Sequence, residues 1–354
     1  MSLPYLQPYF GLGNSLQTAQ AGGAGGAVGG WVELARTTLG SAGDTISVTS
    51  LPDKRYYMIL ADQRASGNTN HSFRLNSDSG NNYSQRASPD GGSDNTLTST
   101  SALLGNWGSA VTTNAFHVGY LSNLSANEKL AQIWNVQQKT AGAGNAPSRQ
   151  EGVGKHAQTS NPINAVSLTN TDSGDYTSGS EVVVLGWDPA DTHTTNFWEE
   201  IGSADLSGGS ADDLDITTGL DKKYLWVQLY IEPSGQVDVN LTFNNDGSAN
   251  YTRRQSFNGG ADGTSINESN VPLSTNITTP VFYNFFMINN SSNEKLVIHH
   301  EARQSTAGAG NAPDREEQVF KWANTSSQIS RIDINNPDTG SFGTNSIIKV
   351  FGSD

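Results

Sequence analysis

The octapeptide TAGAGNAP occurs twice in this chain, at residues 140–147 and again, letter for letter, at residues 306–313. The two copies start 166 positions apart in a chain of 354 residues. Two explanations fit such an identity: the protein uses one kind of site twice, or the whole chain is a duplication that includes the motif. The sequence around each copy decides between them.

Comparing the chain with itself extends the match far beyond eight residues. DKRY at 53–56 corresponds to DKKY at 221–224, and NEKL at 127–130 recurs at 293–296. The offset is 168 residues for the first pair and 166 for the second. An ordered series of matches with one two-residue slip is typical of a tandem duplication. The octapeptide therefore belongs to a repeated unit.

The extent of the matches predicts two homologous domains, residues 31–188 and 198–354. Between them lies a short polar linker at 189–197. Pro189 stands at the start of this linker and is expected to end a strand, because proline has no backbone N–H for sheet pairing. Residues 1–30 precede the duplicated units.

Residues 1–30 fall into two parts of different composition. The second part, AQAGGAGGAVGG at 19–30, has almost no side chains to bury and predicts a flexible tether. The first part combines prolines with the large apolar residues Leu3, Tyr5, Leu6, Tyr9 and Phe10. Such a segment beyond a glycine tether indicates an arm that docks on a neighbouring subunit, and the alternative is that it packs on its own domain. The chain start lacks the basic and apolar regions of a signal peptide.

Short apolar runs bounded by turn residues predict strands in both units. YYMIL at 56–60 and YLWVQLYI at 224–231 are rich in β-branched or aromatic residues. VDVNLTF at 237–243 alternates with period two, as a half-buried antiparallel strand does. Sustained helical periodicity is hard to find. We expect roughly eight strands per unit and an all-β protein of two tandem β-sandwiches of the jelly-roll kind.

The composition limits the class of protein further. The formal net charge is −14, and a surface of this sign does not attract the phosphates of a nucleic acid. The chain contains no cysteine, so it has neither disulfides nor thiolate metal ligands. No apolar run is long enough for a transmembrane helix. We therefore expect no direct nucleic-acid binding and no transmembrane segment.

Two acidic turns are candidate calcium sites, NSDSGNNY at 76–83 and NNDGSANY at 244–251. The candidate ligands are Asn76, Asp78, Asn244 and Asp246. Oxygen-rich side chains around a glycine are what Ca²⁺ prefers, although the spacing of an EF-hand is absent. The favoured alternative is a structural turn, because Asn, Asp and Gly accept positive φ and cap their own backbone. The tyrosine that closes each turn is expected at the edge of the sandwich.

The stretch His299-His300-Glu301 is a second candidate for metal binding. On a strand, His299 and Glu301 share one face, as two ligands would. The first unit has Ile133-Trp134-Asn135 at the matching positions, and a third ligand is not apparent. We therefore favour polar residues on the solvated face of a strand over a metal site.

Enzyme motifs are missing from the sequence. It contains no GxSxG, no HExxH, no phosphate-binding loop and no cysteine nucleophile. Carboxylate pairs such as Glu199-Glu200 do not stand out among 34 acidic residues, and the separation that a glycosidase needs is a spatial quantity. Tryptophans that either form a sugar-stacking platform or fill a core are Trp107, Trp134, Trp187, Trp226 and Trp322. We expect no enzymatic activity and no cofactor.

The second unit closes with KWANTSSQISRIDINNPDTGSFGTNSIIKVFG at 321–352, and each unit carries an N-x-D-x-x-x-N-Y turn. This pattern resembles β-sandwich structural proteins of tailed phages and other marine viruses. The resemblance implies a particle component, of the capsid, capsid-decoration or tail kind, and brings no catalytic residues with it. The first unit departs from the pattern at 155–166, where it reads KHAQTSNPINAV.

Self-assembly is the mechanism that these observations favour. A duplicated sandwich builds pseudo-symmetry into one chain, which suits a trimer or a lattice. An acidic surface suits the outer shell or tail of a virion. We therefore expect a non-enzymatic virion structural protein whose partners are its own copies and other virion proteins.

Three other functions remain open on the sequence. A carbohydrate-binding or adhesive protein of an extracellular surface would share the fold, and it would line an exposed groove with Trp and Tyr. A glycan-degrading enzyme would place two carboxylates opposite each other in a cleft. A filament subunit would insert its arm into the next copy.

Overall fold

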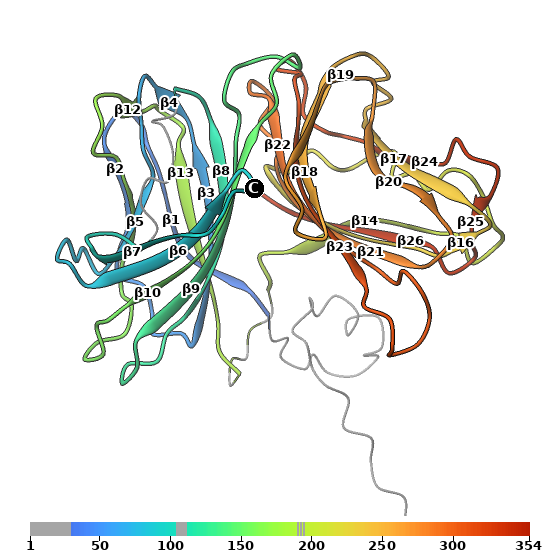
Figure 1. The fold of residues 1–354 in the computed structure, drawn as a ribbon. Helices are drawn as coiled ribbons and strands as arrows, with labels where there is room; N and C mark the ends of the chain where they lie inside the picture. Colours follow the sequence, from blue (N-terminus) through green and yellow to red (C-terminus); the bar gives the residue numbers. More distant parts are fainter. Residues whose placement is uncertain (1–29, 104–111, 190, 192, 194) are drawn as a thin grey trace, which may run out of the picture.

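Figure 1 shows the computed structural model of the chain, in which residues 30–103, 112–189, 191, 193 and 195–354 are described. Every regular element in these residues is a β-strand. Two sandwiches follow one another along the chain, each with one eight-stranded sheet and smaller sheets. The predicted all-β fold of two tandem β-sandwich domains is therefore confirmed. The described residues form no helix that is long and apolar enough to cross a membrane.

The described residues of the first domain form thirteen strands. They are β1 (Val32–Thr38), β2 (Thr45–Val48), β3 (Tyr56–Gln63), β4 (Ala65–Ser66), β5 (Ser72–Leu75), β6 (Tyr83–Pro89), β7 (Asn95–Thr100), β8 (Ala115–Ser122), β9 (Lys129–Gln137), β10 (Ser148–His156), β11 (Val166–Thr169), β12 (Asp175–Tyr176) and β13 (Glu181–Trp187). The large sheet has the order β1-β13-β3-β8-β9-β10-β6-β7, and the smaller sheets are β2-β11-β5 and β12-β4.

The second domain repeats the large sheet of this arrangement. Its strands are β14 (Glu199–Asp205), β15 (Tyr224–Ile231), β16 (Pro233–Ser234), β17 (Val237–Phe243), β18 (Tyr251–Phe257), β19 (Gly263–Glu268), β20 (Val271–Ile277), β21 (Val281–Ile288), β22 (Lys295–Arg303), β23 (Asp314–Trp322), β24 (Ile332–Asn335), β25 (Ser341–Phe342) and β26 (Ile347–Ser353). The large sheet has the order β14-β26-β15-β21-β22-β23-β18-β19, which matches the first domain strand for strand, and the smaller sheets are β20-β17-β24 and β16-β25.

The duplication extends to the irregularities of the sheets. The register of β1 against β13 shifts between Glu33 and Ala35, and that of β14 against β26 shifts between Glu200 and Gly202. A shift of this kind bends an edge strand and increases its twist. The expected number of roughly eight strands per unit corresponds to the large sheet alone. The two-residue strands of the small sheets are too short for an alternating pattern to predict.

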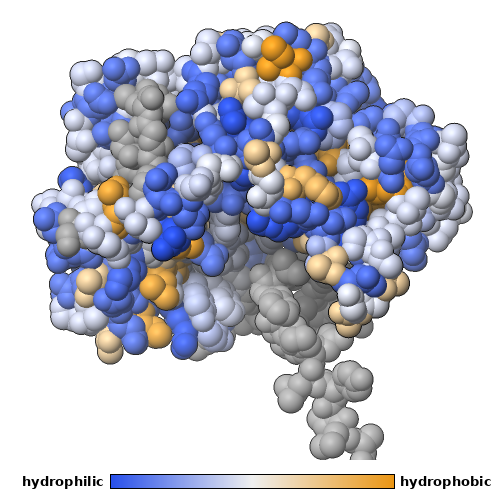
Figure 2. All heavy atoms as spheres, in the orientation of Figure 1, coloured by the Kyte–Doolittle hydropathy of each residue, from blue (hydrophilic) through white to orange (hydrophobic). Residues whose placement is uncertain are grey.

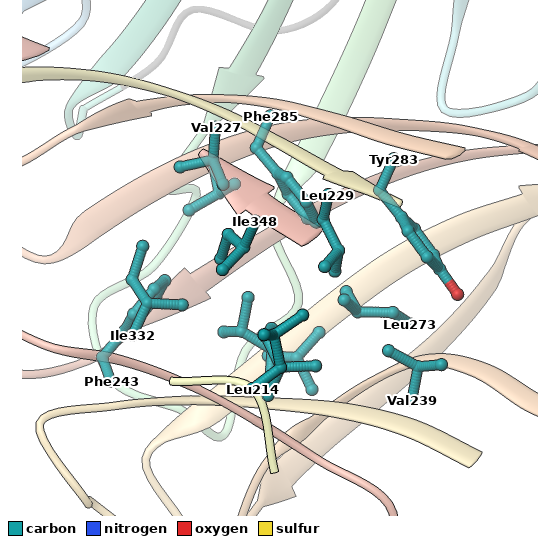
Figure 3. Packing of buried hydrophobic residues seen from close by; sticks show 14 of the residues in the cluster. Leu214, Val227, Leu229, Val239, Phe243, Leu273, Tyr283, Phe285, Ile332 and Ile348 are labelled. Carbon is teal, nitrogen blue, oxygen red and sulfur yellow. The ribbon is translucent and has the colours of Figure 1, made fainter. Parts of the chain in front are cut away.

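The core of the second domain lies between its large and small sheets, as Figure 3 shows. Val227 and Phe285 project from the large sheet toward Phe243 and Ile332 on the opposite side. All four side chains are fully buried. Burying a side chain of this size contributes roughly 1.5–3 kcal/mol of stabilisation. The first domain has an equivalent cluster between its own sheets.

The two cores differ at one matching position of β10 and β23. Gly154 pairs with Ala131 in the first domain, whereas Phe320 pairs with Val297 in the second. A Cβ atom on Gly154 would lie 2.6 Å from the carbonyl oxygen of Leu103, whose side chain is completely buried. Leu103 therefore occupies the space that the phenyl ring fills in the second domain.

The large sheets of the two domains pack against each other through their outer faces. Figure 1 shows β8 beside β22 in the middle of the molecule, with the three-stranded sheets on the far left and far right. The buried residues of this interface are Met58, Leu60, Phe116, Val118, Val136, Val183 and Leu185 on one side, and Tyr224, Trp226, Phe286, Ile288, Leu296, Ile298, Val319 and Phe351 on the other. Phe197 of the linker and Trp198 at the start of the second domain complete this interface. An apolar interface thus joins the domains.

The repeated NEKL motif has a structural role in both domains. The Nζ atom of Lys129 donates hydrogen bonds to the carbonyl oxygens of Leu124, Asn127 and Gln158, at 2.9, 2.7 and 3.1 Å. Lys295 does the same in its own turn, and burial lowers its pKa to about 8. Each lysine satisfies carbonyl groups that the sheet leaves without a partner.

Candidate functional site

The acidic turn of the first domain holds its carboxylate by internal hydrogen bonds. The Oδ1 atom of Asp78 accepts from the backbone N–H of Gly80 at 2.8 Å, and Oδ2 accepts from the amide of Asn82 at 2.8 Å. The Nε2 atom of His156 also lies 2.8 Å from Oδ2. Burial acts to raise the pKa of Asp78, but these hydrogen bonds, led by that of His156, lower it overall.

The turn of the second domain is built in the same way. Asp246 accepts hydrogen bonds from the N–H of Ser248 at 3.0 Å and the amide of Asn250 at 2.8 Å. The indole N–H of Trp322, at the position of His156, donates to Asp246 at 2.7 Å. These bonds also lower the pKa of Asp246 against the effect of burial.

The asparagines that open the two turns are structural. Asn76 and Asn244 have φ values of 54° and 55°, a region that asparagine tolerates better than most residues. The Oδ1 atom of Asn76 accepts from the N–H of Asn164 at 2.7 Å, which ties the turn to the next loop. The closing tyrosines were expected at the sandwich edge, and this is wrong: Tyr83 and Tyr251 are buried in the two cores.

These contacts agree with the favoured alternative, a structural turn. The described residues contain no group of three or more His, Asp or Glu side chains that could hold a metal ion. In both turns the carboxylate oxygens already accept hydrogen bonds. Calcium binding by Asn76, Asp78, Asn244 and Asp246 stays a prediction that no contact in the structure requires.

The expectation that residues 299–301 face solvent is wrong for two of the three. His299 and Glu301 point into the core of the second domain and are buried. The ring of His299 stacks on Phe285 at a centroid distance of 4.5 Å. His300 points the other way and contacts Trp134 of the first domain at 5.6 Å. The expectation assumed that polar side chains face water, but the smaller sheet covers the face of β22 that carries His299 and Glu301.

Glu301 lies directly opposite Glu316 on β23, so two carboxylates share one buried place. The Ser274 hydroxyl donates to Glu301 at 2.7 Å, and the amide of Gln318 donates to Glu316 at 3.1 Å. Burial raises the pKa of Glu301 to about 7, and burial together with the charge of Glu301 raises that of Glu316 to about 8. A buried carboxylate pair of this kind holds a proton near neutral pH.

The first domain fills the same place with neutral side chains. Asn135 and Gln150 stand opposite each other on β9 and β10, and the Asn135 amide donates to Gln150 at 3.1 Å. His71 lies 3.4 Å from Gln150, and His117 lies 3.1 Å from Gln63. Burial lowers the pKa of His71 to about 4 and that of His117 well below its ordinary value. At matching positions, the first domain therefore buries amides and histidines, and the second domain buries two carboxylates.

The first octapeptide, residues 140–147, is docked across the domain boundary. The Nζ atom of Lys321 donates to the carbonyl oxygen of Thr140 at 2.6 Å, and the N–H of Gly142 donates to Glu294. The N–H of Asn267 donates to the carbonyl oxygen of Ala143 at 2.9 Å. Lys321 and Glu294 form a fully buried ion pair at 3.0 Å. The octapeptide is therefore a joint between the two domains.

The second octapeptide, residues 306–313, is exposed over its whole length. The first domain has residues of the same types at the positions that bind the first octapeptide in the second domain. Lys155 and Glu128 form an ion pair there at 2.9 Å, as Lys321 and Glu294 do at 3.0 Å. This pair is exposed, because nothing described covers it. The docking of the first octapeptide is not reciprocated, and the two domains separate on that side.

The space on that side is a groove of about 1130 Å³, which we call the interdomain groove. Its apolar and aromatic lining residues are Trp31, Tyr56, Tyr57, Tyr120, Leu121, Leu130, Ala131, Val153, Trp187, Pro189, Trp198 and Trp226. The Tyr56 and Trp187 rings stack at 5.5 Å, and the Trp31 and Tyr120 rings lie 5.9 Å apart. Aromatic surface therefore dominates the groove.

Charged groups in the groove are few. The charged residues of its lining are Arg86, Lys155 and Asp191. Asp191 is engaged in an ion pair with Lys54. The acidic pair Glu301 and Glu316 lies in the core of the second domain, away from this lining. The groove thus lacks, among its described residues, the facing carboxylates that the glycosidase alternative requires.

The predicted tryptophan platform is only partly assembled. Trp187 and Trp226 line the groove, Trp322 fills the core of the second domain, and Trp134 lies in the domain interface. Trp107 lies outside the described residues. Trp31, Tyr56 and Tyr120 cannot be recognised as groove residues from the sequence, because outward-facing aromatic residues on strands resemble core residues until the partner surface is known.

The predicted arm residues Leu3, Tyr5, Leu6, Tyr9 and Phe10 also lie outside the described residues. The described chain begins at Gly30, which together with Trp31 lines the interdomain groove. Away from the groove, Figure 2 shows a face that is mostly hydrophilic, with small and separate hydrophobic patches. Gly30 therefore lies at the edge of this groove.

Comparison with known proteins gives weak likenesses. No family model and no curated protein matches the chain. The LG1-3 region of the laminin α2 chain aligns with a TM-score of 0.21 and 8% identity, covering 87% of this chain and 64% of that one. Domains LG4-5 of the mouse laminin α1 chain align with a TM-score of 0.17 and 9% identity, covering 92% of each chain. Likenesses at this level assign no function.

Proposed function

We propose that this protein is a non-enzymatic structural component of a virion, of the capsid, capsid-decoration or tail kind, that acts by self-assembly. Its place would be the outer shell or the tail. The partners would be other copies of the chain and other virion proteins.

The observation that carries the proposal is the one-sided joint between the domains. An apolar interface joins the two sandwiches, and Lys321 and Glu294, a buried ion pair of the second domain, add hydrogen bonds to the first octapeptide. The second octapeptide and the Lys155–Glu128 pair, which are made of the same residue types, stay exposed. A chain that contains one closed joint and one open joint has surface left for a neighbour, as heterologous assembly requires.

The proposal is tested by the assembly state of the full chain. Light scattering over a concentration series, followed by negative-stain imaging, is expected to show regular oligomers or lattices. A full-length variant in which Tyr5, Leu6, Tyr9 and Phe10 are all replaced by serine, called the arm variant below, is expected to lose them. A wild-type chain that stays monomeric at every concentration, with and without Ca²⁺, would overturn self-assembly.

A second candidate function is a carbohydrate-binding or adhesive protein of an extracellular surface. The aromatic lining of the interdomain groove favours it, because sugar rings stack on Trp and Tyr faces. A glycan array probed with the arm variant tests this candidate. Binding that disappears when Trp187 is replaced by alanine would support it, and an array without any signal would contradict it.

A further inference from the structure

Part of the groove wall belongs to the first domain, and the matching surface of the second domain is covered by the first domain. Leu130 and Val153 of the first domain occupy the positions of Leu296 and Val319 in the second. In the second domain these positions are 1% and 3% exposed, because the first domain packs on them. In the first domain they are 57% and 49% exposed. A contiguous apolar surface that stays exposed on a folded chain often marks a site of protein interaction.

The groove has the size and lining of a peptide site. Its volume of about 1130 Å³ exceeds the roughly 300–1000 Å³ typical of small-molecule pockets. Aromatic-lined grooves are the usual receptors for proline-stiffened segments, which lose little entropy when they bind. Trp31, Tyr56, Tyr120 and Trp187 supply that lining here.

One segment of this chain has the matching chemistry. LPYLQPYF at 3–10 combines two prolines with five large apolar or aromatic residues. Residues 1–29 contain no Asp, Glu, Lys, Arg or His, so docking would bury no unpaired charge. The segment is attached at Gly30, which itself lines the groove.

The length of the tether indicates which groove the segment reaches. Residues 11–29 are nineteen residues, which extend to roughly 65 Å when straight and average roughly 24 Å as a flexible chain. A segment that filled the groove beside its own attachment point would need only a few residues of tether. A tether of this length is long enough to reach beyond the chain's own groove, as docking on a second copy requires.

We propose that residues 3–10 of one chain dock in the interdomain groove of a second copy. This inference rests on the proposed function and names the site at which the arm makes its contact. Exchange of such an arm between identical chains closes a ring or continues along a lattice, according to the angle between neighbours. The exposed Leu130 and Val153 would become buried in each occupied groove.

Two full-length variants with complementary defects test the proposal. The first is the arm variant, which keeps an intact groove. The second carries Leu130→Glu and Val153→Glu, which place two carboxylates in the apolar groove and leave the arm intact. Both residues are exposed, so the change is compatible with folding. Leu124→Glu is the matched control, because Leu124 is an exposed leucine that does not line the groove.

Native mass spectrometry and light scattering give the readout. We expect wild type and the Leu124→Glu control to associate, each defective variant alone to stay monomeric, and an equimolar mixture of the two defective variants to form a heterocomplex. A synthetic peptide of residues 1–14 is expected to bind the arm variant and change its tryptophan fluorescence.

Four results would overturn the inference. Peptide binding without a heterocomplex would assign the groove to the arm of the same chain. Absence of peptide binding would remove the arm as occupant, and a glycan that changed the tryptophan fluorescence instead would assign the groove to sugars. If the wild-type chain associates while the mixture does not, the proposed function stands and this inference fails. If the wild-type chain does not associate at all, both fail.

Discussion

The two copies of the octapeptide have one sequence and two environments. The first copy lies against the second domain, where Ala143 is buried and Gly142 donates to Glu294. The second copy is exposed at every position. Both copies keep the same internal turn, with the N–H of Asn145 or Asn311 donating to the carbonyl of Gly142 or Gly308. The local sequence therefore determines the shape of the loop. Whether the loop docks on the other domain depends on the surface of that domain.

The outer faces of the two large sheets differ in polarity, which agrees with the different environments of the two octapeptides. Ile288 and Ile298 of the second domain are buried against the first domain, and the matching residues of the first domain are Ser122 and Gln132, which line the groove. Replacing isoleucine by Ser or Gln weakens a close apolar contact. A duplicated chain that kept both faces apolar would offer two equivalent joints. This chain has one closed joint and one open groove.

The largest expected effect comes from the buried ion pair of the joint. Lys321→Met leaves the carboxylate of Glu294 buried without a counter-charge, which costs about 3–5 kcal/mol of unfolding free energy. Lys155→Met removes the matching exposed pair and costs about 0–1 kcal/mol. Urea unfolding followed by tryptophan fluorescence measures both. An equal loss of unfolding free energy in the two variants would contradict the difference between a buried ion pair at Lys321 and an exposed one at Lys155.

The buried polar clusters predict opposite responses of the two domains to pH. Glu301 and Glu316 have raised pKa values, so the folded second domain binds protons that the unfolded chain releases above about pH 4.5. Their contribution to the free energy of unfolding therefore falls as the pH rises toward 8. His71 and His117 have lowered pKa values, so the first domain loses stability as the pH falls below about 6.5. His299, buried in the second domain, adds an acid-side loss there.

Glu316→Gln isolates the carboxylate contribution, since glutamine is what the first domain has at this position, as Gln150. The variant is expected to gain roughly 2–4 kcal/mol at pH 8 relative to pH 5, because one unit of pKa difference is worth about 1.4 kcal/mol. Hydrogen exchange in β22 and β23, measured at both pH values, reports the gain. A variant with the same pH profile as wild type would show that these carboxylates titrate normally.

The smallest effect is expected from bulk added to each octapeptide. Ala143→Trp places an indole in the closed joint and costs about 1–3 kcal/mol by overpacking. Ala309→Trp makes the same change in the exposed copy and is expected to stay within about 0.5 kcal/mol of wild type. Thermal unfolding of the pair checks this. A larger loss from Ala309→Trp would place the second copy in a contact within the isolated chain.

Much of the fold followed from patterns that repeat along the chain. The duplication, the strands such as 224–231 and 237–243, and the turns at Asn76 and Asn244 are local features, which sequence records directly. The small sheets were underestimated because strands such as β12 (Asp175–Tyr176) contain too few residues to show a period. These strands form because the large sheet positions their partners.

The candidate site could not be predicted to the same extent. The groove exists because two homologous faces meet on one side and separate on the other, and no residue alone records that angle. The burial of His299 and Glu301 likewise depends on Ser274 and Phe285, which come from other strands. Alternation identified which residues share a face, but which face is covered was decided by packing over long range.

The most direct measurement of the central claim is hydrogen exchange of the two octapeptides in the wild-type chain at a concentration where it is monomeric. We predict that the amide of Gly142, which donates to Glu294, exchanges slowly, while that of Gly308 exchanges at nearly the rate of an unstructured peptide. Equal protection of residues 140–147 and 306–313 would contradict it, because the chain would then contain either two closed joints or none.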